Sequence, residues 1–161
     1  MSPELDKKLC EKYPKIFRDR HASIKQSCMA WGFDIGDGWY NIIDNACGLI
    51  QLRIDERRKD KLRDLKKVRR KEKLYDWEQA SINVPKIQQV VANQIKEKFG
   101  SLRFYYSGGD DYVDGVVQMA ESMSYDTCEV CGKPGKPKNE GWIKVRCESC
   151  LKDEQFGSEK L

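Results

Sequence analysis

The sequence is poor in histidine and has no long hydrophobic run. His21 is the only histidine among 161 residues, which excludes a two-histidine metal site and argues against a catalytic triad with a histidine base. No stretch approaches the roughly 20 apolar residues of a membrane-spanning helix, and the N-terminus lacks the apolar run of a signal peptide. We therefore expect a soluble, intracellular chain with no membrane partner, and His21 on its surface.

No internal repeat is visible either, so a solenoid or another repeat architecture is not predicted. Hydrophobic residues make up 39% of the chain and charged residues 35%. This balance predicts one modest core beneath a heavily charged surface. The length suits one domain, or one domain with a small module attached.

Cysteine, by contrast, is arranged in a specific pattern near the C-terminus. Cys128 and Cys131 form one Cys-x-x-Cys pair, Cys147 and Cys150 form another, and fifteen residues separate the pairs. This spacing is typical of a four-thiolate zinc site. Two disulfides or a redox motif are the alternatives, but the first does not suit a chain without a signal peptide and the second needs only one pair. We predict structural Zn²⁺, with no open coordination position for chemistry.

The residues around these pairs predict a zinc ribbon over 125–152. Gly132 follows the first pair, where the chain needs a positive φ to turn back. Residues 141–146 alternate in polarity like a strand that leads into the second pair. The other cysteines, Cys10, Cys28 and Cys47, are isolated in helical patterns and are expected to be reduced and buried.

Positive charge is concentrated in one segment. Residues 53–73 contain twelve Lys and Arg against five Asp and Glu, a net of +7, whereas the whole chain carries +4. Such a segment is typical of a polyanion-binding surface, but also of a long solvated helix. The candidate nucleic-acid-binding residues are Lys66, Lys67, Arg69 and Arg70 in this segment, with Lys144 and Arg146 in the ribbon.

Hydrophobic periodicity predicts an α+β fold, with a mostly helical core, few strands and the C-terminal ribbon. The core should span residues 1–124, and a polar tail without fixed structure should span 153–161. Helices are expected from Pro3 to Pro14, over about 22–31, from Trp39 through the basic segment, from Pro85 to Phe99, and after Asp110 as N-cap. One strand is expected at 101–106, with Leu102 and Phe104 on its apolar face.

Two segments combine polar and aromatic residues without an obvious core role for all of them. The first is the glycine-rich loop Gly36-Asp37-Gly38 with its flanking aromatics, and the second is the polar face of the strand at 101–106. We predict that they approach each other and that Asp37 and Arg103 face a shared cleft. The alternative is a capped helix start and an ordinary exposed strand. The candidate ligand-binding residues are Trp31, Asp37, Trp39, Tyr40, Lys98, Arg103, Tyr105, Asp110 and Asp111.

Three strings together resemble a widespread family of small proteins encoded by tailed bacteriophages and prophages, whose function is unassigned. They are residues 28–40, residues 96–111, and residues 119–123 followed by Cys128-Glu-Val-Cys131-Gly132. The resemblance implies a phage accessory protein that acts in the bacterial cytoplasm. It supplies no catalytic residue.

These observations favour a binding protein over an enzyme. The first hypothesis is a counter-defence protein that captures a nucleotide-type ligand or blocks a host defence protein. The second is a DNA- or RNA-binding protein that uses the basic segment and the ribbon. The third is a nucleotide-processing enzyme built on Asp37, Asp44, Asp110 and Asp111. A homo-oligomer is compatible with all three.

Overall fold

The structure, a computed structural model, describes residues 1–70, 72–83, 86–138 and 141–158. The fold is α+β, as the sequence predicted, and the described residues form two small sheets and five α-helices. The helices are α1 (Pro3–Lys12), α2 (Tyr40–Arg69), α3 (Asp76–Asn83), α4 (Asp111–Ser124) and α5 (Glu148–Ser158). The strands are β1 (Phe33–Asp34), β2 (Gln88–Lys98), β3 (Ser101–Gly109), β4 (Lys136–Lys138) and β5 (Lys144–Arg146).

The larger sheet has the order β1-β2-β3, with β1 parallel and β3 antiparallel to β2. The hairpin between β2 and β3 closes through Phe99 and Gly100, whose φ angles of 55° and 75° are typical of a type I′ turn. The strand expected at 101–106 is therefore present. It extends three residues further than expected, to Gly109.

The helix expected from Pro85 to Phe99 is wrong, because Gln88–Lys98 form the strand β2. Pro85 itself lies outside the described residues. The pairing of β2 with β3 shifts register between Gln88 and Val91 and again between Ala92 and Gln94. Such bulges break strict alternation, so Val90, Val91 and Ala92 are all buried. This irregular spacing of apolar residues resembled a helical stripe.

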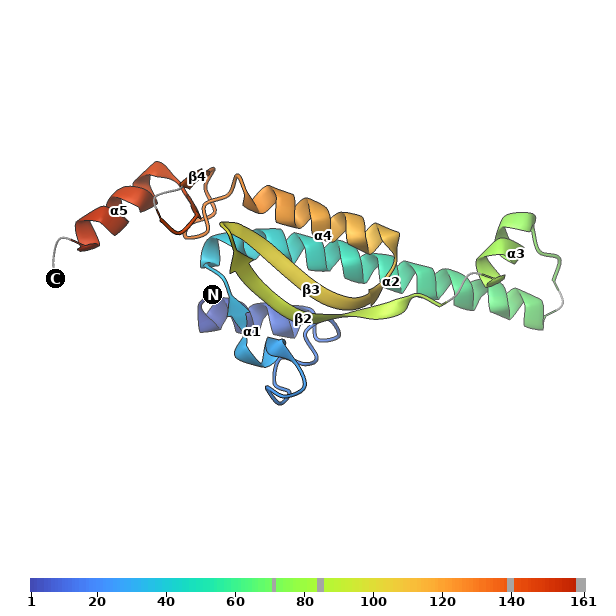
Figure 1. The fold of residues 1–161 in the computed structure, drawn as a ribbon. Coiled ribbons are helices and arrows are strands. Elements are labelled where there is room, and N and C mark those ends of the chain that lie inside the picture. The colour runs from blue at the N-terminus through green and yellow to red at the C-terminus, as the bar shows by residue number, and fades with distance from the viewer. Residues whose placement is uncertain (71, 84–85, 139–140, 159–161) are drawn as a thin grey trace.

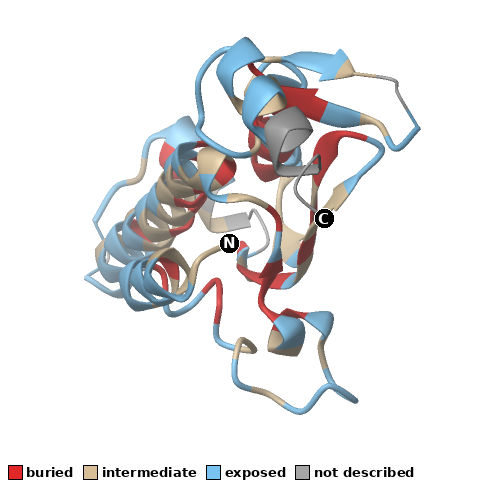
Figure 2. Ribbon diagram, turned by 90° about the vertical axis from the view of Figure 1, so that its left-hand side faces the viewer, coloured by how far each residue is buried: buried red, intermediate tan, exposed pale blue. Residues whose placement is uncertain are grey.

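Helix α2 is the longest element, with 30 residues and a length of about 45 Å. Its first half packs against the sheet and α4, while its second half projects beyond the body and carries α3 beside its end (Figure 1). Figure 2 shows the buried residues on the sides that the helices and strands turn toward one another. After Ile54 the only buried residue of α2 is Asp64. We call residues 55–83, apart from Lys71, the basic arm.

Two further expectations about helices need correction. Residues 22–31 contain turns and a short 3₁₀ helix at Cys28–Trp31 instead of an α-helix, and both Cys28 and Trp31 are exposed. The polar tail expected at 153–161 is helical up to Ser158, where α5 ends. The last three residues lie outside the described part of the chain.

Within the described residues, no helix combines the length and the hydrophobicity that crossing a membrane requires.

Candidate functional site

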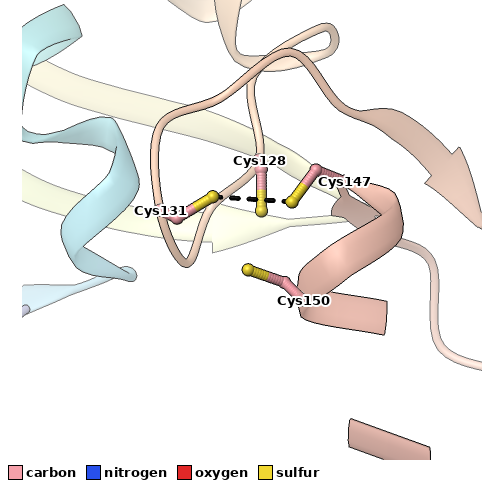
Figure 3. A group of neighbouring side chains, drawn as sticks. All are labelled: Cys128, Cys131, Cys147 and Cys150. Atoms are coloured by element: carbon pink, nitrogen blue, oxygen red, sulfur yellow. Dashed lines mark hydrogen bonds between the residues drawn. The ribbon is translucent and has the colours of Figure 1, made fainter. Parts of the chain in front are cut away.

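The four cysteines predicted as metal ligands lie together (Figure 3). Their sulfur atoms all lie within 4.8 Å of one another, and the Sγ atoms of Cys131 and Cys147 are 3.5 Å apart. A tetrahedral zinc ion with Zn–S bonds of about 2.3 Å requires sulfurs about 3.8 Å apart. The donor set and its spacing therefore fit a four-thiolate metal ion, and this is the only such ligand group among the described residues.

Local backbone geometry brings the sulfurs to this position. Gly132 has a φ of 74°, the positive value that its place after the first Cys pair predicted. Cys147 directly precedes α5, and the Ser149 hydroxyl, followed by the backbone N–H of Cys150, lowers the pKa of its thiol to about 6. A thiolate is the form that binds a metal, so this environment favours the ligating state of Cys147.

The glycine-rich loop at 36–38 packs directly against the first cysteine pair. The N–H of Gly38 donates to the carbonyl oxygen of Glu129 at 2.7 Å. A Cβ atom on Gly38 would lie 2.2 Å from the carbonyl oxygen of Cys128, and a Cβ atom on Gly36 would lie 2.3 Å from that of Glu129. Only glycine permits backbones to approach so closely. The loop therefore docks the metal centre onto the core.

Glu129, the residue after Cys128, connects three parts of this interface. Its Oε1 accepts the N–H of Gly36 at 3.0 Å, and its Oε2 accepts Nη1 of Arg146 at 3.1 Å. Its own N–H donates to the carbonyl oxygen of Val145 in β5. The loop, the first cysteine pair and β5 are thus joined through one side chain.

The predicted ligand pocket at the glycine loop is not formed as expected. Trp39 is fully buried, and its Nε1 donates to the carbonyl oxygen of Thr127 at 2.8 Å, so it cannot form the wall of a surface pocket. Asp37 accepts the N–H of Ser2 at 2.6 Å and begins a 3₁₀ turn instead of capping α2. Tyr40 is half-buried beneath the ammonium group of Lys8, whereas Trp31 is 67% exposed.

The strand residues of that pocket have partners of their own. Nη2 of Arg103 donates to the Tyr125 hydroxyl at 3.4 Å, and its Nη1 lies 3.8 Å from Glu121. Asp37 and Arg103 do not pair with each other, because β2 separates the strand that leads to Asp37 from β3. Tyr105 is exposed with Lys96 near its ring, and Lys98 lies near the ring of Phe99.

Replacing Arg103 with alanine should therefore cost about 1 kcal/mol of unfolding free energy and not several, because its hydrogen bonds are partly solvated. The hydrogen bond from Arg103 lowers the pKa of the Tyr125 hydroxyl, so the substitution should also raise that pKa. Phenolate absorbance during a pH titration measures this shift in pKa. The signal that is missing in a Tyr125→Phe protein identifies the contribution of Tyr125. An unchanged titration in Arg103→Ala would contradict the assigned contact.

The four aspartates of the enzyme hypothesis do not form one site. Asp110 caps α4 as predicted and accepts Nη2 of Arg53 at 3.0 Å, which joins α4 to α2. Asp44 accepts Nζ of Lys12 at 2.7 Å, and Asp111 is exposed in the first turn of α4. Among the described residues, no acidic cluster with metal-binding spacing includes them.

The basic arm carries a hollow lined by cations. Its volume is about 360 Å³, and its lining residues are Lys59, Leu62, Arg63, Lys66, Lys67, Arg70 and Glu72. Lys59, Arg63 and Lys66 recur about once per turn of α2, and Arg70 follows at its C-cap, so one face of the helix presents a basic stripe. Three of the four predicted arm residues line the hollow, whereas Arg69 is exposed outside it. We call this hollow the basic groove.

The groove cations differ in how far their charge is neutralised. Lys67 pairs with the buried carboxylate of Glu78 in α3, and this hydrogen bond lowers the pKa of Glu78. Arg63 lies 3.1 Å from Asp60, and Arg70 lies 3.7 Å from Glu72. Lys59 and Lys66 are exposed and form no ion pair with any other described residue. No carboxylate of the described residues therefore competes with a partner for these two lysines.

The two ribbon residues predicted to contact nucleic acid lie differently. Arg146 is buried and donates to Glu129, so its guanidinium group is not displayed on the surface. Lys144 is exposed on β5, opposite Lys138 on β4.

Sequence reasoning missed the role of Glu129 and the pair formed by Tyr75 and Trp77 at the start of α3. Glu129 acts on a residue 93 positions away, and no local pattern encodes such a contact. Lys59 and Arg63 could have been found, because their spacing from Lys66 places them on the same helical face.

Comparison of the chain with protein-family models, with curated proteins and with solved structures found no match in any of the three. The resemblance to phage accessory proteins stays a prediction.

Proposed function

We propose that this chain is a nucleic-acid-binding protein in which a zinc-stabilised ribbon holds the core together and the basic arm contacts phosphates. Four thiolates at this spacing suit Zn²⁺ and leave no open coordination position, so the metal has a structural role. Cys128, Cys131, Cys147 and Cys150 would hold it.

The observation that carries the proposal is the basic groove on a part of the chain that projects from the body (Figure 1). Neutralising phosphates releases the counterions condensed on nucleic acid, and this release drives sequence-independent binding. A stripe with one cation per helical turn can pair with several phosphates of one strand. The two unpaired lysines, Lys59 and Lys66, give up no ion pair when they do so.

The alternative of a nucleotide pocket between the glycine loop and β3 has less support. Its aromatic wall, Trp39, is inside the core, and the polar groups of the loop are used in docking the ribbon. The phage setting that the sequence resemblance implies suits a nucleic-acid binder in the bacterial cytoplasm. In that setting, blocking a host defence system would proceed through the nucleic acid that the system recognises.

Charge reversal of Lys59 and Lys66 to glutamate tests this proposal. We expect affinity for a single-stranded DNA oligomer to fall at least 10-fold at about 50 mM salt, and the slope of log K against log salt to become shallower by roughly 0.7 for each lost contact. Fluorescence anisotropy at several salt concentrations measures both quantities. Lys67 is left unchanged because its removal would strand the buried carboxylate of Glu78.

The matched control reverses Lys7 and Lys25, which are exposed outside the arm and change the net charge equally. If both double variants weaken binding alike, the effect is one of net charge and the arm is not the site. If wild-type protein binds no nucleic acid at about 50 mM salt, the proposed function is wrong.

A further inference from the structure

Two aromatic side chains near the basic groove are exposed for no reason that the fold supplies. Tyr75 is 69% exposed and Trp77 is 60% exposed. Both lie where the chain, after the end of α2, turns into α3. Large aromatic side chains in soluble proteins are mostly buried, so two exposed rings that lie together form a candidate contact surface.

The geometry of this pair is that of a stacking platform. The two rings are parallel to within 5°, and their centroids are 6.4 Å apart. That separation lies near the upper end of the range for direct aromatic contact, about 4.5–7 Å. The rings are therefore parallel but make few contacts with each other. A planar group can stack on either ring without breaking many of these contacts.

The backbone at Tyr75 is linked to a cation of the groove through one carboxylate. The backbone N–H of Tyr75 donates to Oε2 of Glu78 at 3.0 Å, and Oε1 of the same carboxylate accepts Nζ of Lys67, which lines the groove. The side chain of Glu78 is buried, so this link is shielded from water. One carboxylate thus connects the backbone of Tyr75 with Lys67 of the basic groove.

We infer that the arm recognises single-stranded nucleic acid, with bases stacked on Tyr75 and Trp77 and phosphates on the cations of the groove. The inference rests on the proposed function and adds the class of nucleic acid. Proteins that bind single-stranded nucleic acid commonly combine a positively charged groove with aromatic rings, because every base has a face that can stack on a ring. In a duplex the bases are already stacked on each other, so the two rings add no binding free energy there. Only the phosphate contacts of the groove cations remain.

The test compares wild-type protein with a Tyr75→Ala/Trp77→Ala variant. The probes are a deoxythymidine oligomer of about 16 nucleotides and a duplex of the same length. Stacking contributes about 1–3 kcal/mol per base, so the variant should bind the oligomer at least 10-fold more weakly. Its affinity for the duplex should stay within about twofold of wild type, and the salt slope should not change, because no cation is removed.

A second variant, Tyr75→Phe/Trp77→Phe, separates stacking from loss of structure. It keeps two rings and should retain most of the affinity for the oligomer, while the quenching of tryptophan fluorescence by the oligomer should disappear with Trp77. Circular dichroism and thermal melting check that both variants keep the helix content and stability of wild type.

Three outcomes would overturn the inference. Oligomer binding that is unchanged by the alanine variant, but lost on reversal of Lys59 and Lys66, would leave the proposed function standing and remove the stacking role. An equal loss for oligomer and duplex would make the pair a structural part of the arm. Complete loss of oligomer binding in the phenylalanine variant would show that the tyrosine hydroxyl or the indole N–H carries the contact, and not ring stacking.

Discussion

Replacing Cys131 with serine is expected to release the metal and to expose residues 128–150 to protease. Zinc bound by thiolates contributes folding free energy directly, on the order of 10 kcal/mol in small zinc-binding domains. The strands β4 and β5 have three residues each, and a two-stranded sheet of that size has little stability of its own. Elemental analysis and limited proteolysis measure the two effects.

The damage should extend into the core, because the first cysteine pair is the docking partner of the glycine loop. The Nε1 atom of the buried Trp39 would lose the carbonyl oxygen of Thr127 as its acceptor. Cys28→Ser is the matched control, since Cys28 is exposed and outside the cluster. A Cys131→Ser protein that keeps one equivalent of zinc, or melts like the control, would contradict the structural role of the metal.

Replacing Gly38 with alanine should cost about 3 kcal/mol or more of unfolding free energy. Its new Cβ atom would lie 2.2 Å from the carbonyl oxygen of Cys128 and 2.5 Å from the backbone nitrogen of Gly132. Both contacts are with backbone atoms of the metal-binding turn, which cannot rotate away as a side chain does. The loop and the turn must therefore separate, and denaturant titration should show the loss.

Gly115→Ala provides the control for this substitution. A Cβ atom on Gly115, in α4, would meet no atom within 4 Å, and alanine is favoured over glycine in a helix by about 0.5–1 kcal/mol. The control should therefore be slightly more stable than wild type. If Gly38→Ala differs from wild type by less than about 0.5 kcal/mol, the close packing of loop and metal centre is wrong.

The sequence was informative where local chemistry decides the structure. Cysteine spacing predicted the metal ligands, helical periodicity predicted α2, and the aspartate after two glycines predicted the N-cap of α4. Each of these signals lies within one continuous segment of the chain. The groove cations also follow a local rule, the spacing of residues on one helical face.

The sequence misled where contacts distant along the chain override local patterns. Strand β2 looked helical because two irregularities in its pairing with β3 bury consecutive residues. The loop with Gly36 and Gly38 was expected to border a ligand cleft, whereas its glycines are required by the close approach of the backbone at Cys128 and Glu129. A glycine-rich loop next to aromatic residues has the same composition whether it binds a ligand or packs against another segment of the chain. Only the segment or ligand that it contacts distinguishes the two cases.

We propose that the basic arm binds nucleic acid and that the zinc ribbon only stabilises the fold. Hydrogen–deuterium exchange of the zinc-loaded protein tests this proposal most directly, with and without a saturating deoxythymidine oligomer. We expect the oligomer to slow exchange in peptides that cover residues 59–79. Exchange in residues 33–40 and 128–150, the glycine loop and the ribbon, should not change. Protection concentrated on the ribbon or on β3, with the arm unaffected, would contradict the account.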